Sequence, residues 1–171
     1  EQIYYKDLPQ LRDALGVPFS ATYMKGRGNY LCQHRFETFK TQKPQNPTDA
    51  TNLKILKIWA QETQNGDRAE LEELSEHIDF WEEISATNEN CLGTECPSYD
   101  NCFITRMRQR AAESDLIIVN HHLLCADAAI RQDAYGEVIP ACSFVIIDEA
   151  HQLEDVATQY FGIHISNYRL E

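Results

Sequence analysis

Three cysteines within one short segment constrain the fold of this chain more than any other feature of its sequence. The segment CLGTECPSYDNC runs from Cys91 to Cys102, and a fourth cysteine, Cys32, lies far upstream in GNYLCQHR. Nothing in the sequence indicates secretion, and reducing compartments suppress structural disulfides. Structural zinc sites usually take their ligands in close pairs, whereas iron–sulfur proteins also use three clustered thiolates and one remote thiolate. The spacing favours an iron–sulfur cluster and leaves zinc or plain structural thiols open.

Basic residues accompany both cysteine segments, although the chain as a whole is acidic. The net charge is -12, which argues against simple nucleic-acid binding. Residues 61–90 carry ten acids and one base, whereas residues 20–43 carry five bases and one acid. A [4Fe–4S] cube held by four thiolates carries net negative charge, which Arg35 and Arg106 would offset.

The hydrophobic pattern predicts an α/β fold with a mainly helical insert. The apolar, β-branched runs at 115–120 and 144–148 are typical of strands buried on both faces of a parallel sheet, and 19–26 also reads as a short strand. Helices are expected over 2–15, 50–62, 103–113 and the HHLLCADAAI segment. A further helix is expected from an N-cap at Asp67, with Glu70 as the reciprocal capping residue and Leu71, Leu74, Ile78 and Trp81 packed inward.

Several shorter observations bound the interpretation. No run of 18 apolar residues occurs, so no membrane-spanning helix is expected. The chain lacks an initiator Met and opens on a helical pattern, which we interpret as a piece of a larger protein. Cys125 and Cys142 are expected to be small buried hydrophobic side chains. His121 and His122 directly follow a predicted strand, which favours strand-end histidines over metal ligands.

The predicted strand at 144–148 ends in two acids, and this is the second chemical signal. Ligands of open α/β sheets bind at the carboxyl ends of the strands. An Asp at position 148 suits the binding of Mg²⁺, and Glu149 is placed to orient and deprotonate an attacking water. His151 follows, suited to relaying the nucleotide state by hydrogen bonding. An acid pair after an apolar run is often coincidental, whereas the full tetrapeptide Asp-Glu-Ala-His is more specific.

Together the two signals resemble the iron–sulfur superfamily 2 DNA helicases of the XPD/DinG type, in particular the bacterial DinG/YoaA-like members. The resemblance rests on KGRGNYLC, CLGTECPSYDNC, DLIIVNHHLL and VIIDEAHQLED, which occur in the family's order. It implies a partial RecA-like parallel sheet with a mainly α-helical iron–sulfur insert. Residues 1–27 and 111–171 would then belong to the first motor domain, and residues 28–110 to the cluster domain.

The resemblance also implies a chemistry for both motifs. The family couples ATP hydrolysis to 5′-to-3′ movement on single-stranded DNA, and its cluster domain forms part of the channel in which the duplex is split. Asp148 and Glu149 would serve ATP and Mg²⁺, and His151 would join hydrolysis to movement. Four residues would ligate a [4Fe–4S] cluster: Cys32, Cys91, Cys96 and Cys102.

The implied partners are single-stranded DNA, forks or loops, and a replication or repair protein. The implied location is the cytoplasm of a bacterium, at the nucleoid, with no membrane partner. Five residues are candidates for DNA contact, although the basic ones would also serve as charge compensation for the cluster: Lys25, Arg27, Tyr30, Arg35 and Arg106.

Departures from the family keep other interpretations open. No G-x-x-x-x-G-K-[ST] loop occurs in the sequence, so this chain alone is not expected to hydrolyse ATP at a useful rate. Missing strands of the motor sheet would leave exposed edges that favour aggregation. A non-catalytic zinc or iron–sulfur interaction module would explain the cysteines and the acidity but not the DEAH segment. An RNA-directed or non-unwinding translocase also fits these residues.

Overall fold

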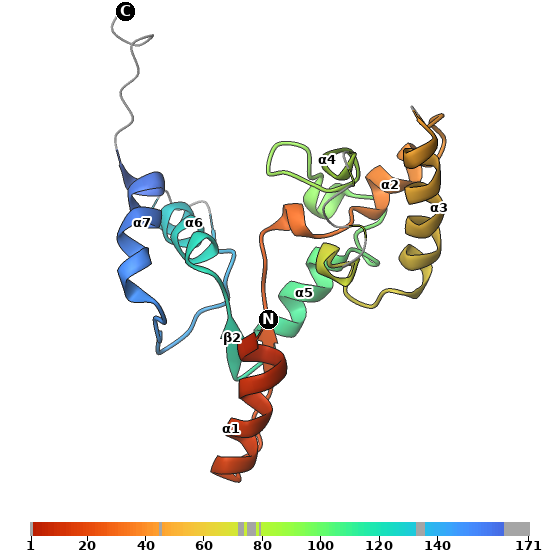
Figure 1. Ribbon diagram of the computed structural model, residues 1–171. Coiled ribbons are helices and arrows are strands. Elements are labelled where there is room, and N and C mark those ends of the chain that lie inside the picture. Colours follow the sequence, from red (N-terminus) through yellow and green to blue (C-terminus); the bar gives the residue numbers. More distant parts are fainter. Residues whose placement is uncertain are drawn as a thin grey trace, which may run out of the picture. The chain divides into compact units, whose positions relative to one another are not determined.

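The chain divides into two compact units. The computed structural model describes residues 2–44, 46–71, 74, 78, 80–132 and 136–162 (Figure 1). Unit 1 comprises Glu1–Met24 and Ala111–Glu171, and unit 2 comprises Lys25–Arg110. Unit 2 is therefore a continuous segment that interrupts unit 1 in the sequence.

Unit 1 combines a small parallel sheet with helices. Its sheet pairs β1 (Ala21–Tyr23) with β2 (Leu116–Ile118) in parallel, with Thr22 opposite Ile117. The helices α6 (His121–Gln132) and α7 (Leu153–Phe161) lie side by side (Figure 1). Parallel pairing of two distant segments is the arrangement predicted for an α/β fold, and this fold class is confirmed.

The helix predicted at the start of the chain is confirmed as well. A π-helical turn, Ile3–Asp7, continues into α1 (Leu8–Leu15). Gly16 ends α1 with φ of 63°, a left-handed conformation that glycine adopts without a steric penalty. The Tyr4 hydroxyl donates to the Ala21 carbonyl at 3.3 Å, which ties the helical segment to β1.

The strand predicted at 144–148 is not formed, and this expectation was wrong. The segment has no strand partner within the described ranges, and its side chains are exposed rather than buried. Phe144 is 89% exposed and Ile146 is 93% exposed. A β-branched run becomes a strand only when a neighbouring strand accepts its backbone hydrogen bonds, and β1 and β2 pair with each other instead. Cys142 just before it is also exposed, contrary to prediction, whereas Cys125 in α6 is buried as expected.

Unit 2 is mainly helical. Its α-helices are α2 (Gln33–Phe39), α3 (Pro47–Glu62), α4 (Trp81–Ile84) and α5 (Phe103–Ala112). Short 3₁₀ turns lie at Arg27–Asn29, Arg68–Glu70 and Gly93–Glu95. Tyr30 bridges to Asp67 and Leu31 to Ser85, both antiparallel. These bridges join the segment before α2 to the segments on either side of α4.

Capping explains where α3 begins and why the helix predicted after Asp67 is short. Asn46 accepts the Asp49 backbone N–H at 2.8 Å and Pro47 occupies the first turn, so α3 starts before the expected residue 50. Asp67 caps a single 3₁₀ turn. Glu70 does not complete a capping box, because its carboxylate accepts hydrogen bonds from the Trp59 indole and the Thr63 hydroxyl.

The hydrophobic stripe expected after Asp67 falls partly outside the described residues, at 72, 73, 75–77 and 79. Leu71, Ile78 and Trp81 are buried as predicted, and Leu74 is half-buried. Within the described part of the chain, no helix combines the length and the apolar character needed to cross a bilayer.

Candidate metal centre

The four candidate cysteines all lie in unit 2, at the ends of short, hydrogen-bonded turns. Cys32 directly precedes α2; its N–H donates to the Ile84 carbonyl at 2.8 Å and its carbonyl accepts the Phe36 N–H at 2.9 Å. A 3₁₀ turn separates Cys91 from Cys96. These contacts fix the backbone on which the sulfur atoms are carried.

Cys102, the last cysteine of the segment 91–102, directly precedes helix α5. The Cys102 N–H donates to the Tyr99 carbonyl at 3.1 Å, and the Cys102 carbonyl accepts the Arg106 N–H at 3.0 Å. Cys102 therefore stands at the first turn of α5, where backbone N–H groups and the helix dipole favour a negative charge. All four thiols are half-buried and none forms a disulfide.

The Cys32 thiol is influenced by the other three candidate cysteines. Burial raises the pKa of the Cys32 thiol, the Arg35 backbone N–H lowers it in part, and the charges of Cys102, Cys96 and Cys91 raise it further. Because Coulomb interactions fall off with distance, this effect places Cys32 within electrostatic range of the other three cysteines. That range is longer than a bond between a metal and its ligand, so it does not by itself assemble a site.

Among the described residues, the structure does not show an assembled metal site at these thiols. No group of three or more described His, Cys, Asp or Glu side chains is arranged to hold a metal ion. Structural zinc needs its ligands close around one centre. A polynuclear iron–sulfur core is held by four thiolates, and this part of the chain offers four half-buried cysteine thiols.

Packing around α5 holds the cysteine loop in place. Phe103, which directly follows Cys102, is 2% exposed, and Ile104, Met107 and Ala111 continue the buried face of α5. The Phe103 ring lies against Gly66, whose φ of 64° and missing side chain permit the approach. Sequence reasoning missed this contact, since it depends on two residues far apart in the chain.

The basic candidates occupy different environments. The Arg35 guanidinium donates to the carbonyls of Glu82 and Glu83 at 3.2 and 3.0 Å, at the end of α4. Arg106 donates to Asn101 at 3.3 Å. Arg27 is half-buried in its 3₁₀ turn. Arg35 thus fastens α4 to α2, a structural role that its position in the sequence did not reveal.

Lys25 and Tyr30 belong to a buried polar cluster. Lys25 Nζ lies 2.8 Å from Asp67 Oδ2, and the Tyr30 hydroxyl accepts the Lys25 backbone N–H at 3.1 Å. Burial first of all raises the pKa of Tyr30 to about 12. With 1% of its surface exposed, Tyr30 has no free face on which a base could stack, so its nomination as a DNA contact is corrected: its described role is in the core.

The acidic residues of unit 1 lie on an exposed loop that leads into α7. Asp148 and Glu149 precede a 3₁₀ turn, Ala150–Gln152, that contains His151. Glu149 has φ of 46°, an unusual left-handed conformation for a side chain of this size, and its carboxylate lies 3.3 Å from His151 Nδ1. The three side chains are exposed, so a ligand could reach them.

His121 connects this loop to the sheet. It stands at the start of α6, shortly after β2 ends, and its Nε2 lies 2.9 Å from the Asp148 carbonyl oxygen. The DEAH segment is therefore held at the carboxyl end of β2, where α/β sheets bind ligands. The sequence predicted a strand-end histidine but not its contact with Asp148.

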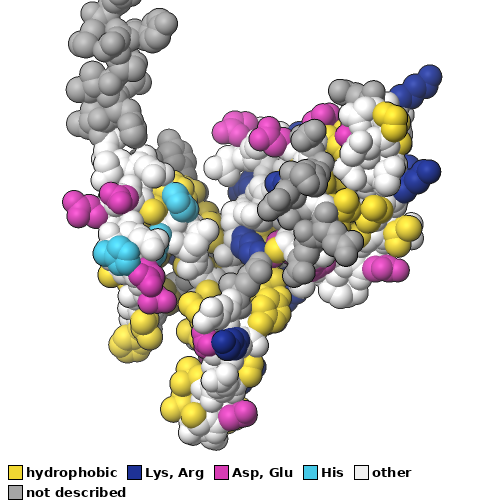
Figure 2. All heavy atoms as spheres, in the orientation of Figure 1, with side chains coloured by type: hydrophobic (Ala, Val, Ile, Leu, Met, Phe, Trp, Pro, Cys, Tyr) yellow, Lys and Arg dark blue, Asp and Glu magenta, His cyan; other side chains and the backbone are white. Residues whose placement is uncertain are grey.

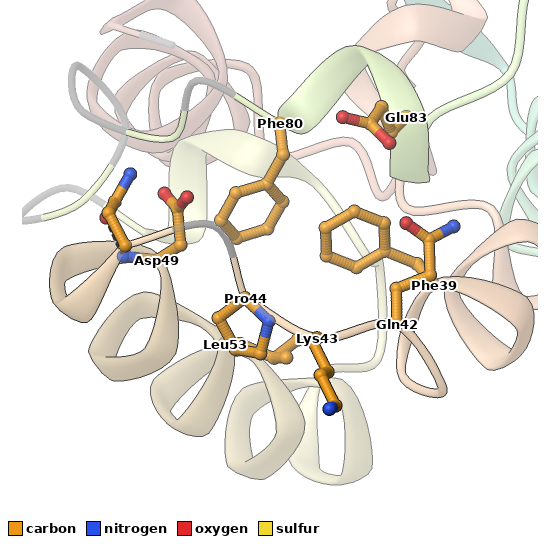
Figure 3. Close-up of a pocket in the computed structure, with 9 residues that line it drawn as sticks. Phe39, Gln42, Lys43, Pro44, Asp49, Leu53, Phe80 and Glu83 are labelled. Atoms are coloured by element: carbon orange, nitrogen blue, oxygen red, sulfur yellow. Dashed lines mark hydrogen bonds between the residues drawn. The ribbon is translucent and has the colours of Figure 1, made fainter.

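Unit 2 also contains a cavity of about 220 Å³ that is lined by aromatic and charged residues rather than by cysteines (Figure 3). Phe39 and Phe80 stack there with ring centroids 4.8 Å apart. The carboxylates of Asp49 and Glu83 lie on the rim, while the Lys43 amine points away from the ring pair. With acids on its rim, this cavity does not suit a phosphate group.

Comparison with known proteins shows the family of the chain. The sequence profile of the DEAD_2 family matches residues 5–170. The ATP-dependent DNA helicase YoaA of Escherichia coli (strain K12) is 37% identical over 171 residues, covering 99% of this chain and 27% of that protein. The ATP-dependent helicase DinG of Mycobacterium tuberculosis (strain H37Rv) is 32% identical, covering 99% of this chain and 28% of that protein.

A third relative carries a different activity in its name. The protein named 3'-5' exonuclease DinG of Bacillus subtilis (strain 168) is 32% identical over 162 residues, covering 95% of this chain and 17% of that protein. The chain thus spans between 17% and 28% of the length of these three relatives.

Proposed function

The chain belongs to the DEAD_2 family, and from this membership we propose that it is the cluster-bearing part of the first motor domain of an ATP-dependent, 5′-to-3′ DNA helicase. Relatives named as ATP-dependent DNA helicases support the motor. Four half-buried cysteine thiols in unit 2, with Cys32 in electrostatic range of the other three, are the observation that supports the cluster. In this proposal unit 1 belongs to the motor and unit 2 is the inserted cluster domain.

Four thiolates would hold a [4Fe–4S] cluster in unit 2: Cys32, Cys91, Cys96 and Cys102. When bound, the cluster supplies a rigid link between segments that are distant in the sequence. The backbone at two of these cysteines is fixed without the cluster, because the Cys32 N–H donates to the Ile84 carbonyl and Cys102 directly precedes α5. Metal binding of this kind contributes to the folding free energy of a small domain. The proposed role of the cluster is therefore structural.

The acidic loop would serve Mg²⁺ and ATP in the complete motor. Asp148 would bind the metal, Glu149 would orient the attacking water, and His151 would relay the nucleotide state through its contact with Glu149. The exposure of these side chains and their place at the carboxyl end of β2 support this assignment. The sequence of this chain contains no P-loop, so the phosphates would need contacts from elsewhere.

DNA contact is proposed for the exposed or half-buried bases of unit 2. Arg27 and Arg106 are the strongest candidates. Arg35, in contrast, donates hydrogen bonds to backbone carbonyls at the end of α4, whereas Arg106 donates to the Asn101 side chain. Lys25 is partly exposed but pairs with Asp67. Single-stranded DNA, forks or loops would be the substrates, with a replication or repair protein as partner, in the bacterial cytoplasm at the nucleoid.

Anaerobic reconstitution with iron and sulfide tests the cluster. We expect about four irons per chain and a broad visible band near 400 nm, the signature of thiolate-bound iron–sulfur centres. Changing Cys32 to Ser should remove the band, whereas the same change at Cys142 should leave it intact, since that thiol lies in unit 1. Stoichiometric zinc without colour would reject the cluster and favour a zinc interaction module.

The motor assignment is tested in the full-length protein by Asp148→Asn. DNA-stimulated ATP hydrolysis should be lost while single-strand binding is retained, because the change removes a metal ligand and no DNA contact. The matched control is Asp155→Asn, an exposed acid in the first turn of α7, which should hydrolyse ATP normally. Equal activity of both variants would contradict the motor assignment.

A further inference from the structure

We propose that His121 is a positioning residue for the acidic loop, and that it holds Asp148 and Glu149 in the backbone conformation from which their carboxylates act on Mg²⁺ and water. The proposal rests on the motor function proposed above, since it concerns the same loop. It adds to that function a residue of α6, whose ring nitrogen contacts the loop. A positioning residue of this kind touches neither nucleotide nor metal and acts through the backbone of the loop.

The position of His121 is fixed by the cap of α6. The Asn120 side chain accepts the Leu123 N–H at 2.8 Å, and the Asn120 carbonyl accepts the Leu124 N–H at 3.1 Å. An asparagine that accepts in this way is a good N-cap, so α6 begins at His121. Leu123 and Cys125 are 8% and 4% exposed and anchor the first turn of the helix in unit 1. The His121 ring therefore leaves the backbone from a defined position.

The contact between His121 and the loop has one possible direction. His121 Nε2 lies 2.9 Å from the Asp148 carbonyl oxygen, a usual length for a hydrogen bond from nitrogen to oxygen. A carbonyl oxygen only accepts, so Nε2 carries the hydrogen atom and donates it. His121 is half-buried, whereas Asp148 and Glu149 are exposed. The contact thus ties an exposed loop to a side chain that is itself partly packed.

The other hydrogen bonds of the acidic loop are local. The Glu149 N–H donates to Asp148 Oδ1 at 2.9 Å, and the Gln152 N–H donates to the Glu149 carbonyl at 2.9 Å. Glu149 Oε2 lies 3.3 Å from His151 Nδ1. Each of these contacts stays within the loop. Among the described residues, the hydrogen bond from His121 is the one that connects the loop to a distant part of the sequence, so it determines where the loop is held.

Glu149 has a backbone conformation that needs support. Its φ of 46° and ψ of 44° lie in the left-handed region, which a residue with a side chain avoids unless the surrounding structure imposes it. Rotation of the peptide between Asp148 and Glu149 would relieve this conformation, but it would also turn the Asp148 carbonyl away from His121. The hydrogen bond therefore opposes the rotation. Because the same peptide sets the directions in which both carboxylates leave the backbone, a contact with its carbonyl positions the two acids.

The neighbouring histidine provides a matched comparison. The rings of His122 and Tyr160 meet edge to face with their centroids 6.2 Å apart, which is packing between α6 and α7. Histidine and acidic side chains lie near one another on the surface of this part of unit 1 (Figure 2). His122 is exposed and makes no hydrogen bond to the loop within the described part of the chain. Replacing it changes the same residue type at the start of the same helix without removing the contact to Asp148.

Hydrogen–deuterium exchange in the full-length protein tests the positioning without any measurement of activity. In the absence of nucleotide, His121→Ala should raise the exchange rate of the Glu149 and Gln152 amides about fivefold, because loss of one hydrogen bond lets the loop open more often. His121→Gln should return the rate to within about twofold of the original, since a glutamine amide also donates an N–H. His122→Ala should leave the rate within about twofold as well.

The Mg²⁺ dependence of ATP hydrolysis by the same protein tests the consequence for the reaction. His121→Ala should raise the Mg²⁺ concentration that gives half-maximal activity about fivefold, because Asp148 is less often in the position that binds the ion. Affinity for single-stranded DNA should stay within about twofold, since no DNA contact is changed. His121→Gln should restore the Mg²⁺ requirement, and His122→Ala should not alter it.

Three results would overturn the proposal. Unchanged exchange and unchanged Mg²⁺ dependence in His121→Ala would mean that the hydrogen bond does not position the loop. Equal effects of His121→Ala and His122→Ala would indicate a general weakening of α6. Failure of His121→Gln to restore either quantity would mean that the donated hydrogen bond is not what matters.

Asp148→Asn separates a failure of this proposal from a failure of the motor function. If Asp148→Asn abolishes ATP hydrolysis while His121→Ala changes neither exchange nor Mg²⁺ dependence, the motor function stands and the positioning role alone is wrong. If Asp148→Asn leaves hydrolysis intact, the motor function is wrong and the positioning role falls with it.

Discussion

Gly66→Ala is expected to destabilise unit 2 by more than its single added methyl group suggests. A Cβ at this position would lie 2.7 Å from Phe103 Cε2 and closer still to two other atoms of the ring. The ring cannot swing into solvent, because Phe103 is 2% exposed and begins the buried face of α5. Nor can the backbone easily move away. The Gly66 carbonyl accepts the Leu31 N–H at 2.9 Å, and its N–H donates to the Thr63 hydroxyl at 2.8 Å.

Two effects add at this position. A left-handed backbone conformation costs a residue with a side chain about 1–2 kcal/mol, and overpacking a core costs about 1–3 kcal/mol. The sum is a loss of about 2–5 kcal/mol, a large share of the about 5–15 kcal/mol that stabilises a typical domain. Gly93→Ala is the matched control, because Gly93 has φ of 56° but no atom within 4 Å of an added Cβ. It should lose only about 1–2 kcal/mol.

The loss of stability is measured by urea denaturation, with tryptophan fluorescence as the signal. This signal reports on unit 2. Both tryptophans of the chain, Trp59 and Trp81, lie in unit 2. Replacing Phe103 by Leu in the Gly66→Ala background should relieve the overlap, so the double variant should be more stable than the sum of the single losses predicts. If Gly66→Ala and Gly93→Ala lower the free energy of unfolding equally, the steric argument is wrong.

The remaining predictions concern two polar side chains, Asp127 and Arg35. Asp127 is 5% exposed and accepts the backbone N–H groups of Val138 and Ile139. Asp127→Asn should therefore destabilise unit 1 by about 2–3 kcal/mol. Circular dichroism should detect this loss, whereas tryptophan fluorescence should not, since both tryptophans lie in unit 2. Burial alone would raise the pKa of Asp127, but hydrogen bonds from Ile139, Arg131 and Val138 lower it overall. The stability that it contributes is therefore present above its unfolded pKa of about 3.9 and is lost as the pH falls below that value, a loss that Asp127→Asn should not show. Arg35→Ala should cost about 1–3 kcal/mol in unit 2, because two carbonyls at the end of α4 lose a charged donor; Arg35→Lys should restore less than half, since an ammonium lacks the planar fork.

Local signals in the sequence predicted those features that depend on neighbouring residues. The end of α1 at Gly16 follows from one glycine conformation, and the extent of α5 follows from an amphipathic pattern that the structure confirms within one residue. The start of α3 was placed late because two capping residues were read as loop. Asn46 and Pro47 are good helix-starting residues as well as common loop residues, and only the hydrogen bond to Asp49 decides between these roles.

The features that could not be predicted depend on residues far apart in the chain. Arg35 was interpreted from its charge and its position beside Cys32, yet its guanidinium is used by carbonyls of α4. Tyr30 was nominated as a DNA contact, yet only 1% of it is exposed. A basic or aromatic residue near a cysteine motif looks the same in the sequence whether its side chain faces a ligand or the core. Only the packing of distant segments distinguishes these cases.

The apolar run at 144–148 shows the same limit for a strand. Its composition fits a strand that is buried on both faces, and its position before Asp148 agrees with the DEAH motif. A strand, however, is a property of at least two segments, since its hydrogen bonds and its buried faces are supplied by others. In the described structure β2 uses β1 as its partner, and the run is left with Ile146 almost fully exposed. The acidic loop nevertheless reaches the carboxyl end of β2, because His121 contacts the Asp148 carbonyl. The position of the candidate nucleotide residues therefore depends on the start of α6 and not on a strand at 144–148.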